Sequence, residues 1–344
     1  MKSHSKVYFF GLLTAWLFAG MATYLLLRQG RYGNFRGLGA MSIALLLWVF
    51  LSYLIFRFRV SIMASRISLA IALFGSLMSV YGVLCLALYI FQDRLVFVPV
   101  NGDFRHCERL LKEDEVVDTQ FAGQKIRLYI RPVVNPRAWM ILFHGNAESA
   151  CRAIVYTEHL RGLGVNFVLA EYPGYLKDAD DSASEQSLTE NSRAVYDFVA
   201  ARNLRKLPVL TFGRSLGTGI ATYVASVREV SGVLLASPYT SIEEVGSYQY
   251  PIFPVRFLTR NIFPANRWAI RASGLVLAAH GTADRVIPFT IGQRQSENFP
   301  HLYKFLKLEN FDHNDIVNLG TSQFWEESRT FVEKIENEAN RARR

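Results

Sequence analysis

The first 91 residues of the chain contain no aspartate and no glutamate. All 29 acidic residues lie beyond this stretch, together with 30 of the 38 lysine and arginine residues. The formal net charge of +9 therefore comes almost wholly from the eight basic residues at the front of the chain. The nearly neutral remainder lacks the basic surface on which nucleic-acid binding depends, so we expect no nucleic-acid partner.

Cysteine is also scarce: the chain has three, none of them in a C-x-x-C pair. This number excludes a disulfide-dense scaffold and leaves the redox compartment open. The sequence contains no H-E-x-x-H, no Walker loop and no G-x-G-x-x-G. Because those motifs hold zinc, nucleotide phosphates and dinucleotides, we expect neither a metal nor an organic cofactor.

Long apolar runs, by contrast, fill the front of the chain. Residues 7–27, 38–56 and 67–91 are three predominantly apolar runs that contain no charged residue. Each is long enough to cross a hydrocarbon core of about 30 Å. We predict that residues 1–91 are a membrane anchor of three transmembrane helices. A cleaved signal peptide is the alternative for the first run, since Lys2 and Lys6 precede it.

The basic residues that flank these runs indicate an orientation. Three spans place the N-terminal tail and residues 57–66 on one side of the membrane, with five basic residues. Residues 28–37 and the start of the second domain share the other side, with four. Basic residues accumulate on the cytoplasmic side. The difference slightly favours a multi-pass protein whose second domain lies outside the cytoplasm.

Residues 92–344 have the pattern of an α/β domain, because short apolar strands alternate with amphipathic helices. Such a pattern predicts a mostly parallel sheet flanked by helices on both faces. We expect strands over 115–121, 125–131, 139–144, 165–172, at the start of 207–227, and over 232–237, 274–280 and 303–308. We expect helices over 148–161, 184–202, at the end of 207–227, and over 318–338, with an inserted cap over about 238–273.

The segment 207–227 carries the first chemical motif, Gly213-Arg214-Ser215-Leu216-Gly217, between a strand and a helix. A serine on so sharp a turn is strained and leaves no room for a Cβ two residues to either side. Its Oγ would then stand clear of the sheet as a nucleophile. The alternative is a glycine-rich turn with no chemical role.

A serine hydroxyl needs a base and a group that orients the base. Of the seven histidines, His313 lies in the loop after the last strand, where the base of this architecture belongs. Asp284 follows the penultimate strand and completes the order Ser, Asp, His. Asp312 and Asp315 are rivals, although as neighbours of His313 they suit loop capping better.

Two backbone amides are expected to stabilise the oxyanion that forms during acyl transfer. One is the amide of Leu216, directly after the nucleophile, and the other comes from the loop that follows the 139–144 strand. We assign the second donor to Asn146, with Ala147 as the alternative. His144, at the start of the same loop, is expected to orient the loop rather than to act as a second base.

Together these motifs resemble the alpha/beta hydrolase superfamily, and specifically its membrane-tethered serine hydrolases with His-Gly-Asn and Tyr-x-Gly-Tyr loops. The matching residues span about 95–317 and are His144-Gly145-Asn146-Ala147, Tyr172-Pro173-Gly174-Tyr175, Gly213-Arg214-Ser215-Leu216-Gly217-Thr218-Gly219, Ser237-Pro238-Tyr239-Thr240-Ser241, His280-Gly281-Thr282-Ala283-Asp284 and His313-Asn314-Asp315. The resemblance implies action on acyl esters, including lysophospholipids and protein palmitoyl thioesters. Glu148 departs from the pattern, since the family usually has glycine there, and the polar loop after Tyr175 lacks the family's Gly-x-Ser.

The inserted cap is rich in aromatic residues and arginine. Its aromatic side chains either line a pocket for an acyl chain or simply cover the sheet. Its arginines either meet anionic headgroups or face solvent, and we slightly favour solvent. The residues concerned are Tyr239, Tyr248, Tyr250, Phe253, Phe257, Phe263 and Trp268, with Arg256, Arg260, Arg267 and Arg271.

We therefore interpret the chain as a membrane-anchored serine hydrolase that acts on a lipid-like or acylated substrate through an acyl-enzyme. A membrane-bound serine peptidase of the aminopeptidase type is the alternative, with Glu243 and Glu244 as the residues that would hold a substrate amino group. A non-catalytic membrane scaffold on the same fold is the third hypothesis. Acyl length, leaving group and oligomeric state are not specified by the sequence.

Overall fold

The computed structural model describes residues 66–100, 115–176, 182–318 and 323–342. The chain divides into two compact units, Met1–Ile90 and Phe91–Arg344. Helix α3, Arg66–Val96, begins in the first unit and ends in the second. Its last six residues, 91–96, therefore belong to the same unit as the sheet, which allows the contacts between them to be described.

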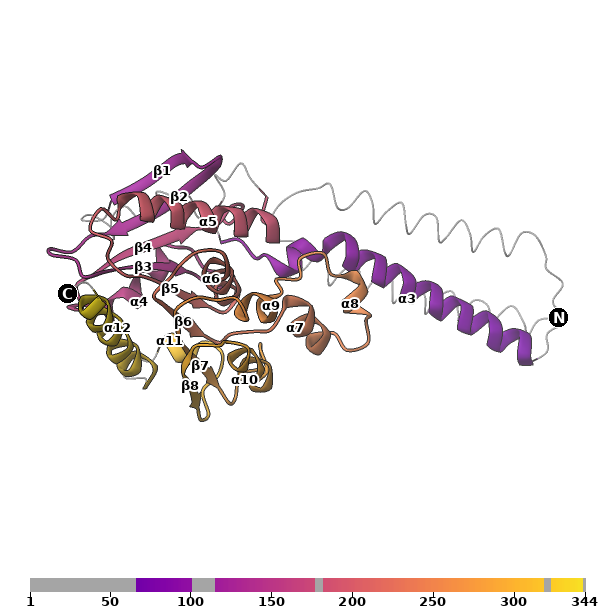
Figure 1. Ribbon diagram of the computed structural model, residues 1–344. Coiled ribbons are helices and arrows are strands. Elements are labelled where there is room, and N and C mark those ends of the chain that lie inside the picture. The colour runs from indigo at the N-terminus through magenta and orange to yellow at the C-terminus, as the bar shows by residue number, and fades with distance from the viewer. Residues whose placement is uncertain (1–65, 101–114, 177–181, 319–322, 343–344) are drawn as a thin grey trace. The chain divides into compact units, whose positions relative to one another are not determined.

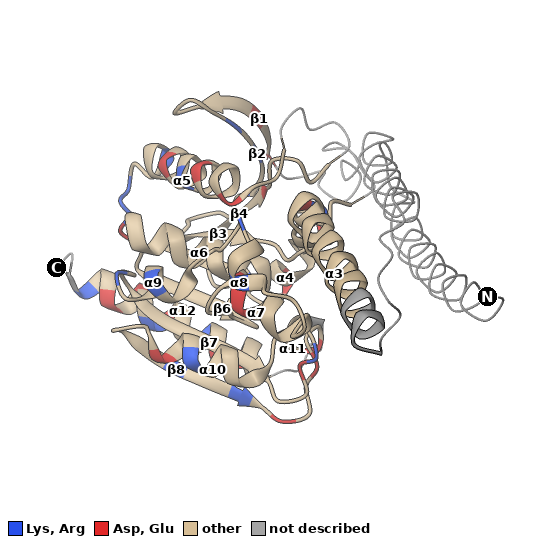
Figure 2. Cartoon of the chain, turned by 90° about the vertical axis from the view of Figure 1, so that its right-hand side faces the viewer, with Lys and Arg blue, Asp and Glu red and all other residues tan. Residues whose placement is uncertain are grey.

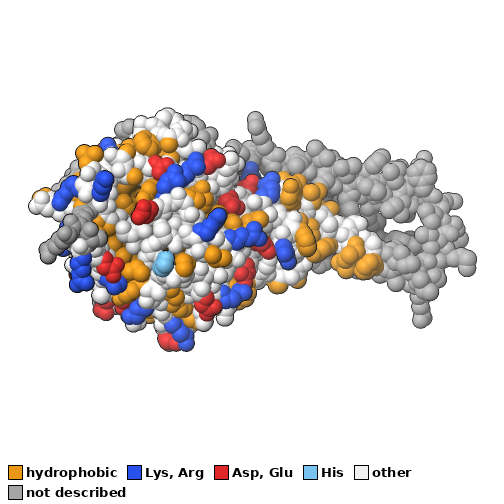
Figure 3. All heavy atoms as spheres, viewed as in Figure 1, with side chains coloured by type: hydrophobic (Ala, Val, Ile, Leu, Met, Phe, Trp, Pro, Cys, Tyr) orange, Lys and Arg blue, Asp and Glu red, His pale blue; other side chains and the backbone are white. Residues whose placement is uncertain are grey.

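Within the described ranges, α3 is the one helix that is long and apolar enough to cross a membrane. The candidate span is Phe74–Val96, with a mean hydropathy of 1.9. Hydrophobic side chains lie exposed along it (Figure 3), and no charge occurs between Ile67 and Gln92. By length and composition, α3 is therefore a candidate membrane span. The predicted spans over 7–27 and 38–56 lie outside the described residues and stay predictions.

An eight-stranded sheet forms the centre of the second unit, in the order β1-β2-β4-β3-β5-β6-β7-β8 (Figure 1). The first two strands of this order form an antiparallel hairpin, β2 pairs antiparallel with β4, and all the remaining pairs are parallel. The mostly parallel sheet predicted from the apolar strands is therefore correct. The strands are β1 Glu115–Phe121, β2 Gln124–Arg131, β3 Ala138–Phe143, β4 Val165–Glu171, β5 Val209–Arg214, β6 Gly232–Ala236, β7 Leu275–Gly281 and β8 Leu302–Leu308.

Helices cover both faces of the sheet, and each face has its own apolar core. Leu188 and Ile220, from α5 and α6, belong to one core, and Phe324 and Phe331, from α12, belong to the other. Burial of both strand faces explains why the central strands are apolar at successive positions rather than alternating. The longer covering helices are α5 Glu185–Arg202, α6 Leu216–Val227, α10 Phe289–Glu297 and α12 Gln323–Ala342.

The prediction of a helix over residues 148–161 is wrong for most of that range. Only a 3-10 turn, Arg152–Ile154, and a short helix α4, Val155–Glu158, form there. Most backbone hydrogen bonds there join residues three apart, as between the Ile154 amide and the Cys151 carbonyl oxygen and between the Leu160 amide and the Thr157 carbonyl oxygen, so the segment forms 3-10 type turns instead of one α-helix. The predicted closing helix over 318–338 instead begins at Gln323, after a separate turn α11, Asp315–Asn318.

The cap predicted over 238–273 contains three short helices, α7 Ile242–Gln249, α8 Val255–Leu258 and α9 Ala265–Ala269. Pro254 and Pro264 stand at the N-caps of α8 and α9, where a residue without an N–H costs no helical hydrogen bond. The cap's aromatic residues divide into two groups. Tyr239, Phe263 and Trp268 are buried in the core, whereas Tyr248, Tyr250 and Phe257 are exposed.

The turn from β5 into α6 holds Ser215 in a conformation that non-glycine residues rarely adopt, with φ 49° and ψ −119°. The turn requires backbones to approach closely on both sides of the serine. A Cβ at position 213 would lie 2.4 Å from the carbonyl oxygen of Gly217. A Cβ at position 217 would lie 2.1 Å from the carbonyl oxygen of Phe143, on β3. Glycine is therefore a steric requirement at both positions.

Replacing Gly217 with alanine tests this requirement. The new methyl group would meet backbone rather than a movable side chain. Such overpacking typically lowers the free energy of unfolding by about 1–3 kcal/mol. We therefore expect Gly217→Ala to lower the melting temperature by several degrees or to prevent folding. The control is Gly82→Ala in α3, where nothing lies within 4 Å of the added Cβ. Equal thermal stability of the two variants would contradict the steric argument.

Candidate active site

The structure brings together the three side chains that the sequence singled out, although they are far apart along the chain. Ser215 Oγ lies 2.9 Å from Nε2 of His313, and Nδ1 of His313 lies 2.7 Å from Oδ2 of Asp284. Ser215 stands between β5 and α6, Asp284 follows β7 and His313 follows β8. With the proton on Nδ1, the ring donates to Asp284 and its free Nε2 can accept the serine proton.

The carboxylate of Asp284 is held ionised by its surroundings. Burial raises the pKa of Asp284, but hydrogen bonds from His280 and His313 outweigh burial, so that the pKa of this carboxyl falls well below its usual range. The amides of Val286 and Ile287 also donate to Oδ1, each at 2.8 Å. A permanently charged carboxylate in this position stabilises an imidazolium on His313.

The two rival carboxylates serve the loop instead. Oδ1 of Asp312 accepts the amides of Arg285 and His313, at 3.1 and 2.8 Å, and Oδ2 of Asp315 accepts the amide of Asp312 at 2.7 Å. Both therefore cap backbone groups around His313. Neither carboxylate is hydrogen-bonded to the His313 ring, whose partners among the described residues are Asp284 and Ser215.

His280 is a member of this site that the sequence analysis did not identify. Its Nε2 lies 2.9 Å from the carbonyl oxygen of Ile287 and 3.2 Å from Oδ2 of Asp284. The ring is fully buried, and Nδ1 has no partner among the described residues. A proton on Nε2 can be shared between these two oxygens. His280 fixes the Asp284 loop and Asp284 itself, so it is a positioning residue.

The expected oxyanion donors are the backbone amide of Leu216 and one amide from the loop after β3. Leu216 is the first residue of α6, where amides have no intrahelical acceptor. In the loop after β3, the amide of Ala147 donates to the carbonyl oxygen of Val98 at 3.1 Å. Ala147 is therefore committed elsewhere, whereas the amide of Asn146 has no acceptor among the described residues. The geometry favours Asn146 over its alternative.

The side chain of Asn146 anchors that loop. Its Nδ2 donates to the carbonyl oxygen of Val96, and its Oδ1 accepts the Val98 amide and the Tyr175 hydroxyl, at 2.8, 2.9 and 2.8 Å. The hydroxyl of Tyr172 donates to the carbonyl oxygen of His144 at 2.7 Å. Both tyrosines of the Tyr-x-Gly-Tyr motif thus brace the proposed oxyanion loop.

His144 is held away from the serine by a buried carboxylate. Its Nε2 lies 3.1 Å from Glu171 Oε1, and its Nδ1 lies 2.8 Å from the carbonyl oxygen of Gly145. Both ring nitrogens therefore face acceptors, which favours the doubly protonated ring. Burial lowers the pKa of His144, but Glu171 raises it by more, and the net pKa lies above the ordinary imidazole value. These contacts join the His144 ring to the backbone of its own loop and to the end of β4.

Glu148, the residue that departs from the family pattern, pairs with the residue that precedes the nucleophile. Its Oε2 accepts from Arg214 Nη1 at 3.0 Å and from the Gly145 amide at 2.8 Å. The second guanidinium nitrogen of Arg214 donates to Oδ1 of Asn314, beside His313. Only 11% of each side chain in the Glu148–Arg214 pair is exposed. This pair ties together the oxyanion loop, the nucleophile turn and the histidine loop.

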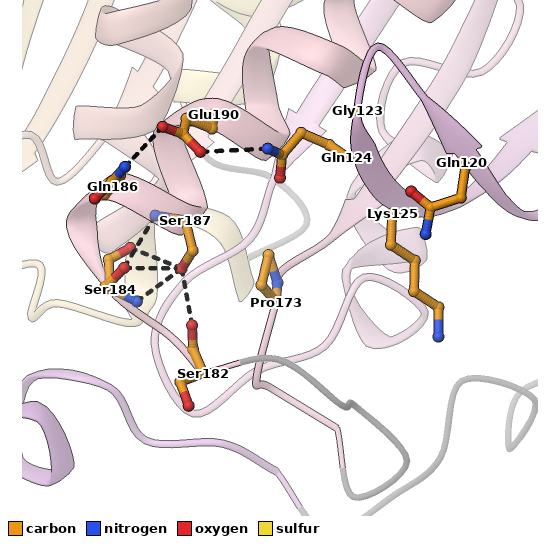
Figure 4. A pocket seen from close by; sticks show the side chains of 10 residues that line it. All are labelled: Gln120, Gly123, Gln124, Lys125, Pro173, Ser182, Ser184, Gln186, Ser187 and Glu190. Atoms are coloured by element: carbon orange, nitrogen blue, oxygen red, sulfur yellow. Dashed lines mark hydrogen bonds between the residues drawn. The ribbon is translucent and has the colours of Figure 1, made fainter.

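A cavity of about 590 Å³ lies away from this site (Figure 4). It is bordered by the β1–β2 hairpin and by the start of α5, and none of its lining residues belongs to the Ser215, His313 and Asp284 cluster. Its lining is mostly polar, with Gln124, Lys125 and Glu190 among the side chains. It therefore lends no support to the acyl pocket that the cap aromatics suggested. Across the described ranges, no three or more His, Cys, Asp or Glu side chains gather as metal ligands.

Neutralising Glu148 tests the role of its pair with Arg214. Glu148→Gln leaves a buried guanidinium without a counter-charge, which costs about 3–5 kcal/mol. We expect a lower melting temperature and a kcat reduced by about tenfold or more, because the oxyanion loop loosens. The control is Glu309→Gln in the exposed pair with Lys307, which should leave the melting temperature and kcat nearly unchanged. Equal effects in both variants would contradict the assigned role.

The His144–Glu171 pair predicts a pH dependence of stability. Because the folded pKa of His144 is raised, its stabilising contribution is fully present below the unfolded pKa of about 6.5 and is lost as pH rises through the folded value. The melting temperature of the unaltered protein should therefore fall as pH rises above neutral. Glu171→Gln removes the cause of the shift, so its melting temperature should vary less over the same range. Parallel pH profiles of the two proteins would refute the pair's contribution.

Comparisons with known proteins agree with this geometry. The family described as "Serine aminopeptidase, S33" matches residues 134–272. An uncharacterized protein of Mycobacterium tuberculosis is 27% identical over 229 residues, which are 65% of this chain and 81% of that protein. The lysophosphatidylserine lipase ABHD12 of Macaca fascicularis is 28% identical over 198 residues, which are 50% of this chain and 48% of the lipase.

Solved structures share the fold at low sequence identity. The esterase Pf2001 of Pyrococcus furiosus aligns with a TM-score of 0.53 and 15% identity, over 66% of this chain and 95% of the esterase. A bacterial membrane phospholipase A aligns with a TM-score of 0.52 and 16% identity, over 79% of this chain and 97% of that one. Sheet order, nucleophile turn and matched relatives lead to the same conclusion: the chain belongs to the alpha/beta hydrolase superfamily and is a serine hydrolase.

Proposed function

We propose that this protein is a membrane-anchored serine hydrolase that cleaves acyl esters or thioesters through an acyl-enzyme on Ser215. The observation that carries the proposal is the continuous hydrogen-bond path from Ser215 through His313 to Asp284, with distances of 2.9 and 2.7 Å. Such a path supplies the base that a serine hydroxyl lacks on its own. The strained turn at Ser215 supports the role further, because it presents Oγ at the edge of the sheet.

The proposed reaction has two halves. Ser215 Oγ attacks the acyl carbonyl carbon while His313 Nε2 takes the serine proton and Asp284 stabilises the imidazolium. The amides of Asn146 and Leu216 hold the oxyanion, and the tetrahedral intermediate expels the alcohol or thiol, which receives the proton from His313. Water then attacks the acyl-enzyme with His313 as base, which releases the carboxylic acid and restores Ser215.

Two features support a lipid-like substrate. The candidate span Phe74–Val96 leads directly into the catalytic unit, which would hold the site near a bilayer. One relative, ABHD12 of Macaca fascicularis, is a lysophosphatidylserine lipase, and this chain spans about half of its length. Long-chain acyl esters, lysophospholipids and acyl-cysteine thioesters are accordingly the substrate classes that we propose.

A peptidase is the second candidate, because the matched family is described as a serine aminopeptidase family. An aminopeptidase needs free carboxylates to hold the substrate amino group. Glu244, one of the two acidic residues considered for this purpose, already accepts from Thr240 and pairs with Arg294. That engagement favours the esterase over the peptidase.

A multi-pass anchor with the catalytic unit outside the cytoplasm is part of the same proposal. Cys151 is disulfide-bonded, whereas Cys85 in α3 is free. Disulfides persist in oxidising compartments and are rare in the cytosol. This bond therefore supports the orientation that the flanking basic residues slightly favour.

Labelling with a fluorophosphonate probe tests the nucleophile. We expect the purified full chain to react with the probe, and Ser215→Ala to abolish both labelling and the hydrolysis of long-chain acyl esters. Thermal stability should be retained, because the hydrogen bond of Ser215 Oγ to His313 is its one side-chain hydrogen bond among the described residues. Each protein is also assayed with lysophospholipid, acyl-cysteine and aminoacyl-amide substrates.

The outcomes separate the candidates. Hydrolysis of the ester or thioester substrates that depends on Ser215 supports the proposal, and turnover of the amides alone would replace it with the peptidase. Labelling that survives Ser215→Ala would contradict the assignment of the nucleophile. Full biological complementation by Ser215→Ala would support a non-catalytic scaffold instead.

A further inference from the structure

The C-terminal end of α3 is fixed to the cap by four hydrogen bonds. Gln92 Nε2 donates to the carbonyl oxygen of Leu258 at 2.9 Å, and Gln92 Oε1 accepts the Arg260 amide at 2.6 Å. Asp93 accepts from the side chains of Arg260 and Asn261, at 2.9 and 2.6 Å. The loop between α8 and α9 is therefore anchored to the last turns of the helix that we assign to the membrane.

The chain that leaves α3 is joined to the proposed oxyanion loop in the same way. Val96 and Val98 bond the side chain of Asn146, and Val98 also accepts the Ala147 amide. Val96 is the last residue both of α3 and of the candidate span Phe74–Val96. Covalent continuity therefore keeps the catalytic site within a short distance of the bilayer boundary.

The part of the cap that precedes Leu258 exposes apolar side chains. Tyr248, Tyr250, Ile252 and Phe257, here called the cap patch, have exposed fractions of 59, 44, 73 and 83%. They lie in the segment from the end of α7 to α8, two helices that pack against each other (Figure 2). The basic side chain of Arg256 is exposed beside them. Aromatic residues with flanking arginine are the composition found at membrane interfaces.

The cap patch also adjoins the catalytic residues. Gln249, within the patch segment, donates from Nε2 to the carbonyl oxygens of Val286 and Arg285, at 2.8 and 3.2 Å. Those two residues directly follow Asp284. The same short segment is thus attached at one end to the loop that orients His313 and at the other to the end of α3.

We propose that the cap patch docks on the surface of the phospholipid bilayer in which α3 is anchored, so that a lipid substrate passes from the leaflet to Ser215 without crossing water. The proposal rests on the membrane anchoring and ester hydrolysis proposed above. The bilayer is the occupant because Leu258, Arg260 and Asn261, which directly follow the patch segment, bond residues 92 and 93 near the end of the candidate span. Burying the four apolar side chains in the interface removes their exposure to water, and Arg256 can meet lipid phosphate.

Photo-crosslinking tests the docking without requiring catalysis. The photoreactive analogue p-benzoylphenylalanine replaces Phe257 in full-length Ser215→Ala protein, reconstituted in phosphatidylcholine vesicles and irradiated. We expect covalent lipid adducts at position 257, detected by mass spectrometry. The matched control places the analogue at Leu204, which is 90% exposed between α5 and β5. Lipid adducts no more abundant at 257 than at 204, or adducts that join two copies of the chain, would overturn the proposal.

A kinetic comparison tests the consequence for substrate entry. Phe257→Ser should lower the hydrolysis of a long-chain ester embedded in vesicles by about tenfold, from the lost interfacial burial of one aromatic ring. Hydrolysis of a short, water-soluble ester should not change, and Leu204→Ser should alter neither reaction. An equal loss on both esters would mean that Phe257 supports the site itself, which overturns the docking role. If the unaltered protein hydrolyses neither ester, the hydrolase proposal fails, and the crosslinking result alone decides the docking.

Discussion

The geometry of the site depends on the close approach of three backbone segments around Ser215: the turn between β5 and α6, and the ends of the neighbouring strands β3 and β6. The turn between β5 and α6 fits only because positions 213 and 217 carry no side chain, and Gly217 rests against the carbonyl oxygen of Phe143 on the neighbouring strand. The amide of Ser215 is held by the carbonyl oxygen of Ala236 on the other neighbouring strand, at 2.9 Å. Sheet pairing on both sides thus maintains a strained φ that an isolated turn would relax.

Buried polar contacts extend this rigidity from the turn to the rest of the site. Arg214 contacts Glu148 on one side and Asn314 on the other, while His280 braces Asp284 from within the core. The Arg214 contacts join loops that follow three different strands, whereas His280 holds Asp284 from the strand that directly precedes its own loop. Preorganised donors and a fixed base lower the cost of reaching the transition state, because little rearrangement remains to be made.

The residues that local pattern and strand order specify were predictable from the sequence. Ser215, Asp284 and His313 each follow a strand, and parallel strands bring their carboxyl ends to one edge of the sheet, so chain order alone was enough to expect them together. His280 and the partner of Glu148 were not predictable, because their roles arise from contacts between distant side chains. The sequence did contain a signal for the Glu148–Arg214 pair, since Glu148 replaces the usual glycine beside a loop that must be buried.

The errors have physical causes of the same kind. The helix expected over 148–161 has suitable periodicity, but the segment forms 3-10 type turns and a four-residue helix, with most hydrogen bonds between residues three apart. Within the cap, Phe263 is buried and Phe257 is exposed, although both occur in similar aromatic sequence. Only the packing of the cap against α6, and its attachment to the end of α3, distinguishes them. Local composition therefore identified the cap, but not which of its aromatic residues are buried and which are exposed.

The central claim is that the acyl group passes through Ser215, and trapping the acyl-enzyme tests this most directly. A reaction with a long-chain ester is quenched in acid during turnover, and the modified residue is located by peptide mass spectrometry. The account predicts a single acyl adduct on Ser215 that disappears when the substrate is exhausted. An acyl group on any other residue, or sustained turnover by a protein that lacks the Ser215 hydroxyl, would contradict it.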